Sequence, residues 1–294
     1  MTTNTTDQAQ TQDQPQPQTQ TQTVSSSGAG GGVRRGWGDS VVFRTVAPVV
    51  TGLLVIVAWQ VVTQAAGVSA TVLPSPLRVW DAAVQNRDVL WANTLPTLKV
   101  TGAGLGATLV TSAVIATALA FVPLLRNATL PLLVVAQSIP IIVLAPLFVI
   151  WFGFGLGPKI GLIVISSTLP MAVSLLQGLL SADPDAATLM KSLGAGRIKV
   201  FWRLQVPSSL PYFFTGLRVI ASFAVLAAVF AETVGAESGL GIYMVIEKNM
   251  LRTDLVLAAA VITIVIGLTL FSLTYLLEAL TMPWERRRRA MRSE

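Results

Sequence analysis

The sequence predicts an all-α integral membrane protein with six transmembrane helices. Of its 294 residues, 53% are hydrophobic and 12% are charged, and the mean hydropathy is +0.68. Globular domains carry about 25% charged residues. A membrane-spanning helix needs about 20 mostly apolar residues. Six segments come near that length, at about Val46–Ala66, Val100–Val122, Leu130–Phe152, Ile160–Leu180, Pro211–Val234 and Leu255–Leu280.

The segments outside the spans divide the chain further. Residues 1–36 are rich in Thr, Gln, Ser and Gly and cannot bury enough apolar surface to fold, so they are expected to form a disordered cytoplasmic tail. Residues 37–285 form the six-helix domain, and residues 286–294 a basic cytoplasmic tail. In the loop 67–93, Pro76 precedes apolar residues at helical spacing. This pattern fits a short interfacial helix or a plain anchored connector.

The distribution of basic residues predicts the orientation, because cytoplasmic loops are enriched in Lys and Arg. With the N-terminus inside, six of the 20 Lys and Arg residues lie outside, which leaves 14 inside. The outer six are Arg78, Arg87, Lys99, Lys159, Lys248 and Arg252. Both termini and the insert between the fourth and fifth spans are then cytoplasmic.

The sequence contains no Cys and no His. It therefore has no thiolate nucleophile, no Cys or His metal ligand and no imidazole catalyst. An intramembrane enzyme is the least favoured class, since only scattered acidic residues remain.

The insert Asp183–Pro211 is polar and amphipathic, unlike the segments around it. Asp183 is a suitable helix N-cap, Pro184 suits the first helical position, and Gly194 suits the end of a first helix. A second helix is expected from about Gly196 to Gln205, with Ile198, Phe201 and Trp202 on one face and a stop at Val206–Pro207. The unit fits either a docking surface for a soluble partner or a hairpin that covers the inner end of the bundle.

The stretch DAATLMKSLGAGRIKVFWRLQVPSSLP resembles the cytoplasmic EAA loop of permease subunits of ATP-binding-cassette importers. Asp185 stands where the family has Glu, the segment Thr188–Leu193 is longer than the family's three residues, and Val206 replaces Leu. The resemblance assigns the first helix to ATPase coupling. The residues concerned are Asp185, Ala186, Ala187, Leu189, Met190, Gly194, Ala195, Phe201 and Pro207.

The segments LPSPLRVW, QSIPIIVLAPLFVIWFGFGLGPKI and AETVGAESGLG are similar to permeases of the nitrate, sulfonate and taurine type. This resemblance implies a permease in a bacterial inner membrane, with a second permease copy, cytoplasmic ATPase subunits and an extracytoplasmic binding protein. The sequence has no GxxxxGK[ST] motif to hold nucleotide phosphates. ATP is therefore expected on the partner ATPase, and this chain is expected to be non-catalytic, with no cofactor of its own.

Polar residues within the spans are candidates for a substrate pathway. They are Gln137, Ser138, Ser166, Ser167, Thr168 and Glu232, and helix–helix hydrogen bonding is the competing role. Glu232 is expected near the outer end of the fifth span, in headgroup water or beside a cation. Gly102 and Gly106 have a small-xxx-small spacing that favours helix packing.

The substrate stays open between two classes. The taurine-type resemblance implies a small anion such as a sulfonate or nitrate. The segment SIPIIVLAPLFVIWFGFG is also similar to permeases for thiamine-precursor pyrimidines, and the pathway candidates include no Arg or Lys, which favours a neutral heterocycle. The alternative to an importer is a membrane scaffold or channel whose inner hairpin only caps the bundle.

Overall fold

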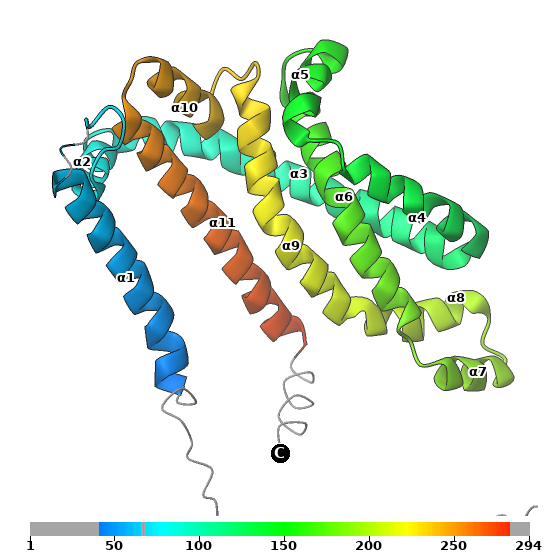
Figure 1. Cartoon of the computed structure of the whole chain (residues 1–294). Helices are drawn as coiled ribbons and strands as arrows, with labels where there is room; N and C mark the ends of the chain where they lie inside the picture. The colour runs from blue at the N-terminus through cyan, green and yellow to red at the C-terminus, as the bar shows by residue number, and fades with distance from the viewer. Residues whose placement is uncertain (1–40, 66, 68, 283–294) are drawn as a thin grey trace, which may run out of the picture. The chain divides into compact units, whose positions relative to one another are not determined.

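The computed structural model describes residues 41–65, 67 and 69–282, and all regular structure within them is helical (Figure 1). The predicted tails, residues 1–36 and 286–294, lie outside this part. The helices are α1 (Val41–Ala65), α2 (Pro76–Gln85), α3 (Arg87–Phe121), α4 (Pro123–Gln137), α5 (Ile141–Phe152), α6 (Leu156–Leu180), α7 (Pro184–Ser192), α8 (Arg197–Val200), the π-helical turn η2 (Phe201–Gln205), α9 (Val206–Thr233), α10 (Leu240–Asn249) and α11 (Thr253–Thr281).

Five helical segments of the described chain are long and apolar enough to cross a membrane. They are Val46–Ala65, Arg87–Phe121, Leu156–Leu180, Arg197–Thr233 and Thr253–Thr281. The predicted third span, Leu130–Phe152, is not one helix. It is divided into α4 and α5 by Ser138, Ile139 and Pro140, because proline lacks an N–H group and disfavours helical geometry in the residue before it.

The chain divides into two units, Met1–Gly52 and Leu53–Glu294. The described part of the first unit is the beginning of α1. In the second unit, the remainder of α1 contacts α2, since the Leu77 N–H donates to Gln60 Oε1 at 3.3 Å. The short helix that the sequence allowed between Gly67 and Asn93 is present as α2.

Helix α2 joins a core that it shares with α10 and α11. Its N-cap is Ser75, whose hydroxyl accepts from the Arg78 N–H at 3.4 Å. Its buried side chain Val79 belongs to a cluster with Leu240 and Leu255. Helix α10 was not expected from the sequence. Its ten residues are too few to form a span, and their apolar face is covered by neighbours far along the chain.

A glycine lets α3 and α6 approach closely at the centre of the second unit. A Cβ atom at Gly104 would lie 2.5 Å from the Ile163 side chain. The packing prediction for Gly102 and Gly106 is wrong within the described part of the chain, where no atom lies within 4 Å of a Cβ at either position. The face of α3 that packs is instead a buried stripe of small residues, which includes Thr97, Thr101, Gly104, Thr108 and Ser112.

The predicted stop at Val206–Pro207 is also wrong. Helix α8 continues through η2 into α9, and Pro207 lies in the first turn of α9. The Val206 N–H donates to the Phe201 carbonyl, which is the wider hydrogen-bond spacing of a π-turn. Such a turn relaxes the clash between a proline ring and the carbonyl four residues earlier. The second helix of the insert is thus the beginning of the long Arg197–Thr233 segment.

Candidate functional site

A pocket lies at the break between α4 and α5 and brings two predicted pathway residues together. Ser138 comes from the break, and Ser166 comes from α6. The Ser166 hydroxyl donates to the Ile163 carbonyl at 2.9 Å and lies 3.4 Å from the Ser167 hydroxyl. The interruption between α4 and α5 therefore positions Ser138, and a turn of α6 positions Ser166.

The remaining lining of this pocket is apolar. Its volume is about 330 Å³, and it is lined by Ser138, Ile139, Pro140, Ile141, Leu144, Ile165, Ser166, Phe223, Leu226, Ala227 and Phe230. No charged side chain is among these residues. A site of this kind can surround a small ring system and offer it a few hydroxyl groups.

The aromatic residues of the lining, Phe223 and Phe230, were not among the predicted pathway residues, which are all polar. Phe223, Ala227 and Phe230 lie on one face of α9, at intervals of four and three residues. Their spacing was available as a signal, since it places two rings on the same side of an otherwise alanine-rich helix.

The other predicted pathway residues lie elsewhere. Ser167 and Thr168 are buried in the helix packing, where the Thr168 carbonyl accepts from the Ser112 hydroxyl at 3.2 Å. Neither residue lines the pocket, and neither hydroxyl donates to another helix in the described chain. The side chain of Gln137 lies outside the described part of the chain.

Glu232 is fully buried, at 0% exposure, rather than in headgroup water as expected. Its carboxylate helps to cap the N-terminus of α10. The N-cap residue there is Gly239, which has no side chain to offer, so the caps come from α3 and α9. The Gly239 N–H donates to Asn93 Oδ1 at 3.1 Å, the Leu240 N–H to Thr97 Oγ1 at 2.9 Å, and the Gly241 N–H to Glu232 Oε2 at 2.9 Å.

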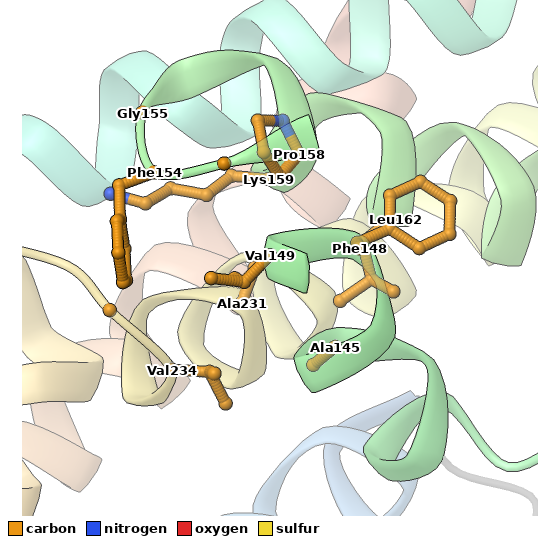
Figure 2. A pocket seen from close by; sticks show the side chains of 12 residues that line it. Ala145, Phe148, Val149, Phe154, Gly155, Pro158, Lys159, Leu162, Ala231 and Val234 are labelled. Carbon is orange, nitrogen blue, oxygen red and sulfur yellow. The ribbon is translucent and has the colours of Figure 1, made fainter. Parts of the chain in front are cut away.

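The turn between α5 and α6 meets the turn between α9 and α10. Gly235 has φ +75°, and a Cβ there would lie 2.3 Å from the Phe154 ring. Figure 2 shows Lys159 extending beside Phe154 in this region, with Ala231 and Val234 nearby. The cavity between these residues measures only about 10 Å³, which is room for about one water molecule and not for a solute.

The insert begins with the predicted capped helix. Asp183 Oδ1 accepts from the Asp185 N–H at 2.9 Å, and Pro184 is the first residue of α7. The helix ends in a Schellman motif, in which the Ala195 N–H donates to the Met190 carbonyl and the Gly194 N–H to the Lys191 carbonyl, each at 2.9 Å. Gly194 has φ +81°, as its predicted role at the helix end requires.

No side chain of α7 is buried. Ala186, Ala187, Met190 and Ala195 are half-buried, whereas Asp185 is exposed. Large apolar side chains of the insert are exposed as well, and we call Leu189, Leu193, Ile198 and Trp202 the insert patch. Exposed apolar side chains of this size in a polar insert are candidates for an interaction surface.

The prediction that Ile198, Phe201 and Trp202 share one face of the second helix is only partly correct. Ile198 and Trp202 are exposed, whereas Phe201 is 7% exposed and packs into a cluster with Leu119 and Leu176. Phe201 therefore fixes the insert to the bundle and does not contribute to the exposed surface.

Replacing Gly194 by valine should strain the end of α7, because a β-branched residue disfavours positive φ. Nothing lies within 4 Å of a Cβ at this position, so the effect should arise from the backbone alone. We expect a local cost of about 1–2 kcal/mol, with the rest of the fold intact. Circular dichroism should show unchanged helix content, while limited proteolysis should cut faster at Lys191. Equal proteolysis of Gly194→Val and Gly196→Val would contradict this, since Gly196 has negative φ.

Both the sequence and the fold have relatives among known proteins. Residues 109–282 match the family described as binding-protein-dependent transport system inner membrane component. The chain is 30% identical to the formylaminopyrimidine transport permease protein ThiX of Halalkalibacterium halodurans over 83% of this chain and 98% of the relative. It is 32% identical to the riboflavin transport system permease protein RibX of Chloroflexus aurantiacus, over 80% and 89%.

A third relative, the taurine transport system permease protein TauC of Escherichia coli, is 37% identical over 55% of this chain and 59% of its own length. A crystal structure of an amino acid ABC transporter with histidines shares the fold. It has a TM-score of 0.54 and 17% identity, and the match covers 67% of this chain and 96% of that one.

Proposed function

The chain belongs to the binding-protein-dependent transport system inner membrane component family, the permease subunits of ATP-binding-cassette importers, and from that premise we propose how it transports its solute. It forms the translocation pathway for a small neutral ring compound. The pocket at the α4–α5 break carries this proposal, because phenylalanines and serines line it without any charged side chain.

The proposed topology has six crossings with both termini in the cytoplasm. The broken pair α4 and α5 supplies the third crossing, since irregular backbone is tolerated at membrane depth where it lines a cavity. The excess of basic residues on the inner side supports the orientation. Two contacts agree with this topology. Arg197 of the insert contacts Phe121 at the end of α3, which fits a cytoplasmic position for both. Phe154 and Gly235 lie together in the turns after α5 and α9, which fits an outer position for both turns.

Helix α7 is proposed to dock on a cytoplasmic ATPase. The insert patch supports this proposal because each of its side chains is more than 60% exposed in the described chain. The residues Asp185, Ala186 and Ala187 would lie in the docking helix. ATP would bind to and be hydrolysed by that partner, while this chain moves with it as a rigid body.

A second copy of the chain and an extracytoplasmic binding protein complete the proposed importer. Phe223 and Leu226 line the pocket and are each 53% exposed, so the pocket is open along this side of α9. A second copy placed against this side would enclose the solute. The binding protein would deliver the solute at the end of the bundle that carries α10.

The relatives support a ring compound as cargo without fixing its identity. Two of the relatives named above are called transporters of formylaminopyrimidine and riboflavin, which are both ring compounds. A small sulfonate such as taurine is the second candidate, because the taurine permease is also similar to this chain. A pocket without charged side chains favours the uncharged ring compound, since the sulfonate group of taurine would be buried there without a cationic partner from the lining.

The function is tested by reconstituting the permease with its ATPase and binding protein in liposomes. ATP-dependent uptake of a labelled hydroxymethylpyrimidine or formylaminopyrimidine, in excess over taurine, is the expected result. Uptake of taurine alone would show that the transported solute is a sulfonate and not a neutral ring compound. Solute flux that does not require ATP would instead indicate a channel.

Replacing Ser166 by tryptophan should fill much of the pocket, whose volume is about 330 Å³. We expect uptake to fall by more than about tenfold, because a bulky ring removes the space that the solute occupies. The control is Val114→Trp, which adds a similar ring at an exposed position on α3 outside the pocket. Normal uptake by Ser166→Trp would exclude this pocket as the pathway.

A further inference from the structure

Helix α7 is not itself packed into the bundle, so a movement of α7 must be transmitted to the spans by the segments next to it. None of its side chains is buried, and it packs against α8. The Schellman motif at Gly194 fixes the turn that joins the two helices. Displacement of α7 can therefore reach the bundle through residues 181–183, which join it to α6, and through α8.

An arginine attaches α8 to the end of α3. Arg197 Nη2 donates to the Phe121 carbonyl at 2.6 Å. The same guanidinium lies 4.7 Å from the centre of the Phe121 ring. Phe121 is the last residue of α3, so its carbonyl has no partner within that helix, and a cation there also complements the helix dipole.

A buried aromatic contact accompanies this arginine. The centres of the Phe121 and Phe201 rings are 5.1 Å apart. Phe201 belongs to the cluster that contains Leu119 of α3 and Leu179 of α6. The end of α3 is thus held by a polar contact from Arg197 and an apolar contact from Phe201.

Within the described residues, the Arg197–Phe121 contact is the one side-chain hydrogen bond that joins Pro184–Gln205 to a span outside the continuous α8–α9 helix. Movement of α7 can reach α6 through residues 181–183 and α9 through η2. It can reach α3 through Arg197 and through the packing of Phe201 against Phe121.

We propose that Arg197 is a positioning residue that couples the movement of α7 to α3. This inference rests on the proposed function, in which α7 docks on an ATPase. Through Arg197, the end of α3 follows α7 during the ATPase cycle, so that α3 and α9 move together. The bundle then responds to the ATPase through both helices rather than through α9 alone.

The test compares Arg197→Ala with Lys199→Ala in the reconstituted importer. Lys199 is an exposed basic residue of the same short helix and has no hydrogen bond or ion pair within the described chain. The measured quantity is the amount of solute transported per ATP hydrolysed. Arg197→Ala should lower this ratio about fivefold while ATP hydrolysis stays within about twofold, and Lys199→Ala should leave both unchanged. Arg197→Lys should restore much of the ratio.

A double-mutant cycle separates coupling from general destabilisation. Phe121→Leu removes the ring that Arg197 and Phe201 both contact but keeps the carbonyl, so its effect on the ratio should be smaller in the Arg197→Ala background than in the wild type. An equal effect in both backgrounds, or an unchanged ratio in Arg197→Ala, overturns the inference. If Arg197→Ala does not assemble, Arg197→Gln, which removes the charge but keeps a side chain of similar size, supplies the same comparison. If the wild-type chain shows no ATP-dependent uptake, the proposed function fails instead.

Discussion

Replacing Gly178 by leucine is expected to destabilise the helix bundle by about 3 kcal/mol, because overpacking a close contact forces the backbones apart. A Cβ at this position would lie 2.8 Å from the Ser209 Cα and 2.8 Å from the Tyr212 Cβ. The Cα atom cannot move without its helix. Helices α6 and α9 must therefore separate along the contact that also positions Ser166 and Phe223.

The measurement is thermal unfolding of the purified protein in detergent. The control is Gly102→Leu, since nothing lies within 4 Å of a Cβ at Gly102. The control should unfold near the wild-type temperature, whereas Gly178→Leu should unfold several degrees lower or fail to accumulate. Equal melting temperatures for the two variants would show that α6 and α9 do not pack at Gly178 in the purified protein.

Replacing Glu232 by alanine should release α10 from α3 and α9. The change leaves the Gly241 N–H without its acceptor and opens a cavity where a fully buried side chain stood. Together these losses should cost about 3 kcal/mol. Thr97 loses one of its partners as well, since its hydroxyl donates to Glu232 Oε2 at 2.9 Å.

Hydrogen exchange followed by mass spectrometry measures this effect directly. Amides of the peptide that contains Leu240 and Gly241 should exchange about a hundredfold faster in Glu232→Ala. Glu232→Gln keeps an accepting oxygen and should change exchange far less. The control is Glu237→Ala, an exposed carboxylate in the same turn. Unchanged protection in Glu232→Ala would mean that α10 is held by its apolar contacts alone.

The two substitutions test different parts of one arrangement. Gly178 controls how closely α6 and α9 approach near the insert, whereas Glu232 controls how α10 is fixed at the opposite end of α9. The pocket lies between them, with Ser166 on α6 and Phe223 on α9. The α6–α9 contact at Gly178 and the cap at Glu232 must both be intact for Ser166 and Phe223 to line the same pocket.

The local features of the insert were predictable from the sequence because they depend on neighbouring residues. Asp183 caps α7, Pro184 opens it, and Gly194 adopts the positive φ that ends it. Each of these outcomes follows from the chemistry of a single side chain and the backbone beside it. The continuation through Pro207 was not predictable in this way, because proline usually ends a helix and here follows a π-turn that begins at the buried residue Phe201.

Length and hydropathy were enough to identify a helical membrane protein, since both act over about 20 consecutive residues. The insert and the family motifs could also be recognised from the sequence, because the residues of each are contiguous in the chain.

The packing of the helices decided which polar residues lie together in the folded chain. Ser138 and Ser166 line a pocket while Ser167 and Thr168 are buried, and Glu232 caps a helix instead of facing water. These roles depend on partners from other helices, and neither hydropathy nor residue spacing specifies which helix faces which.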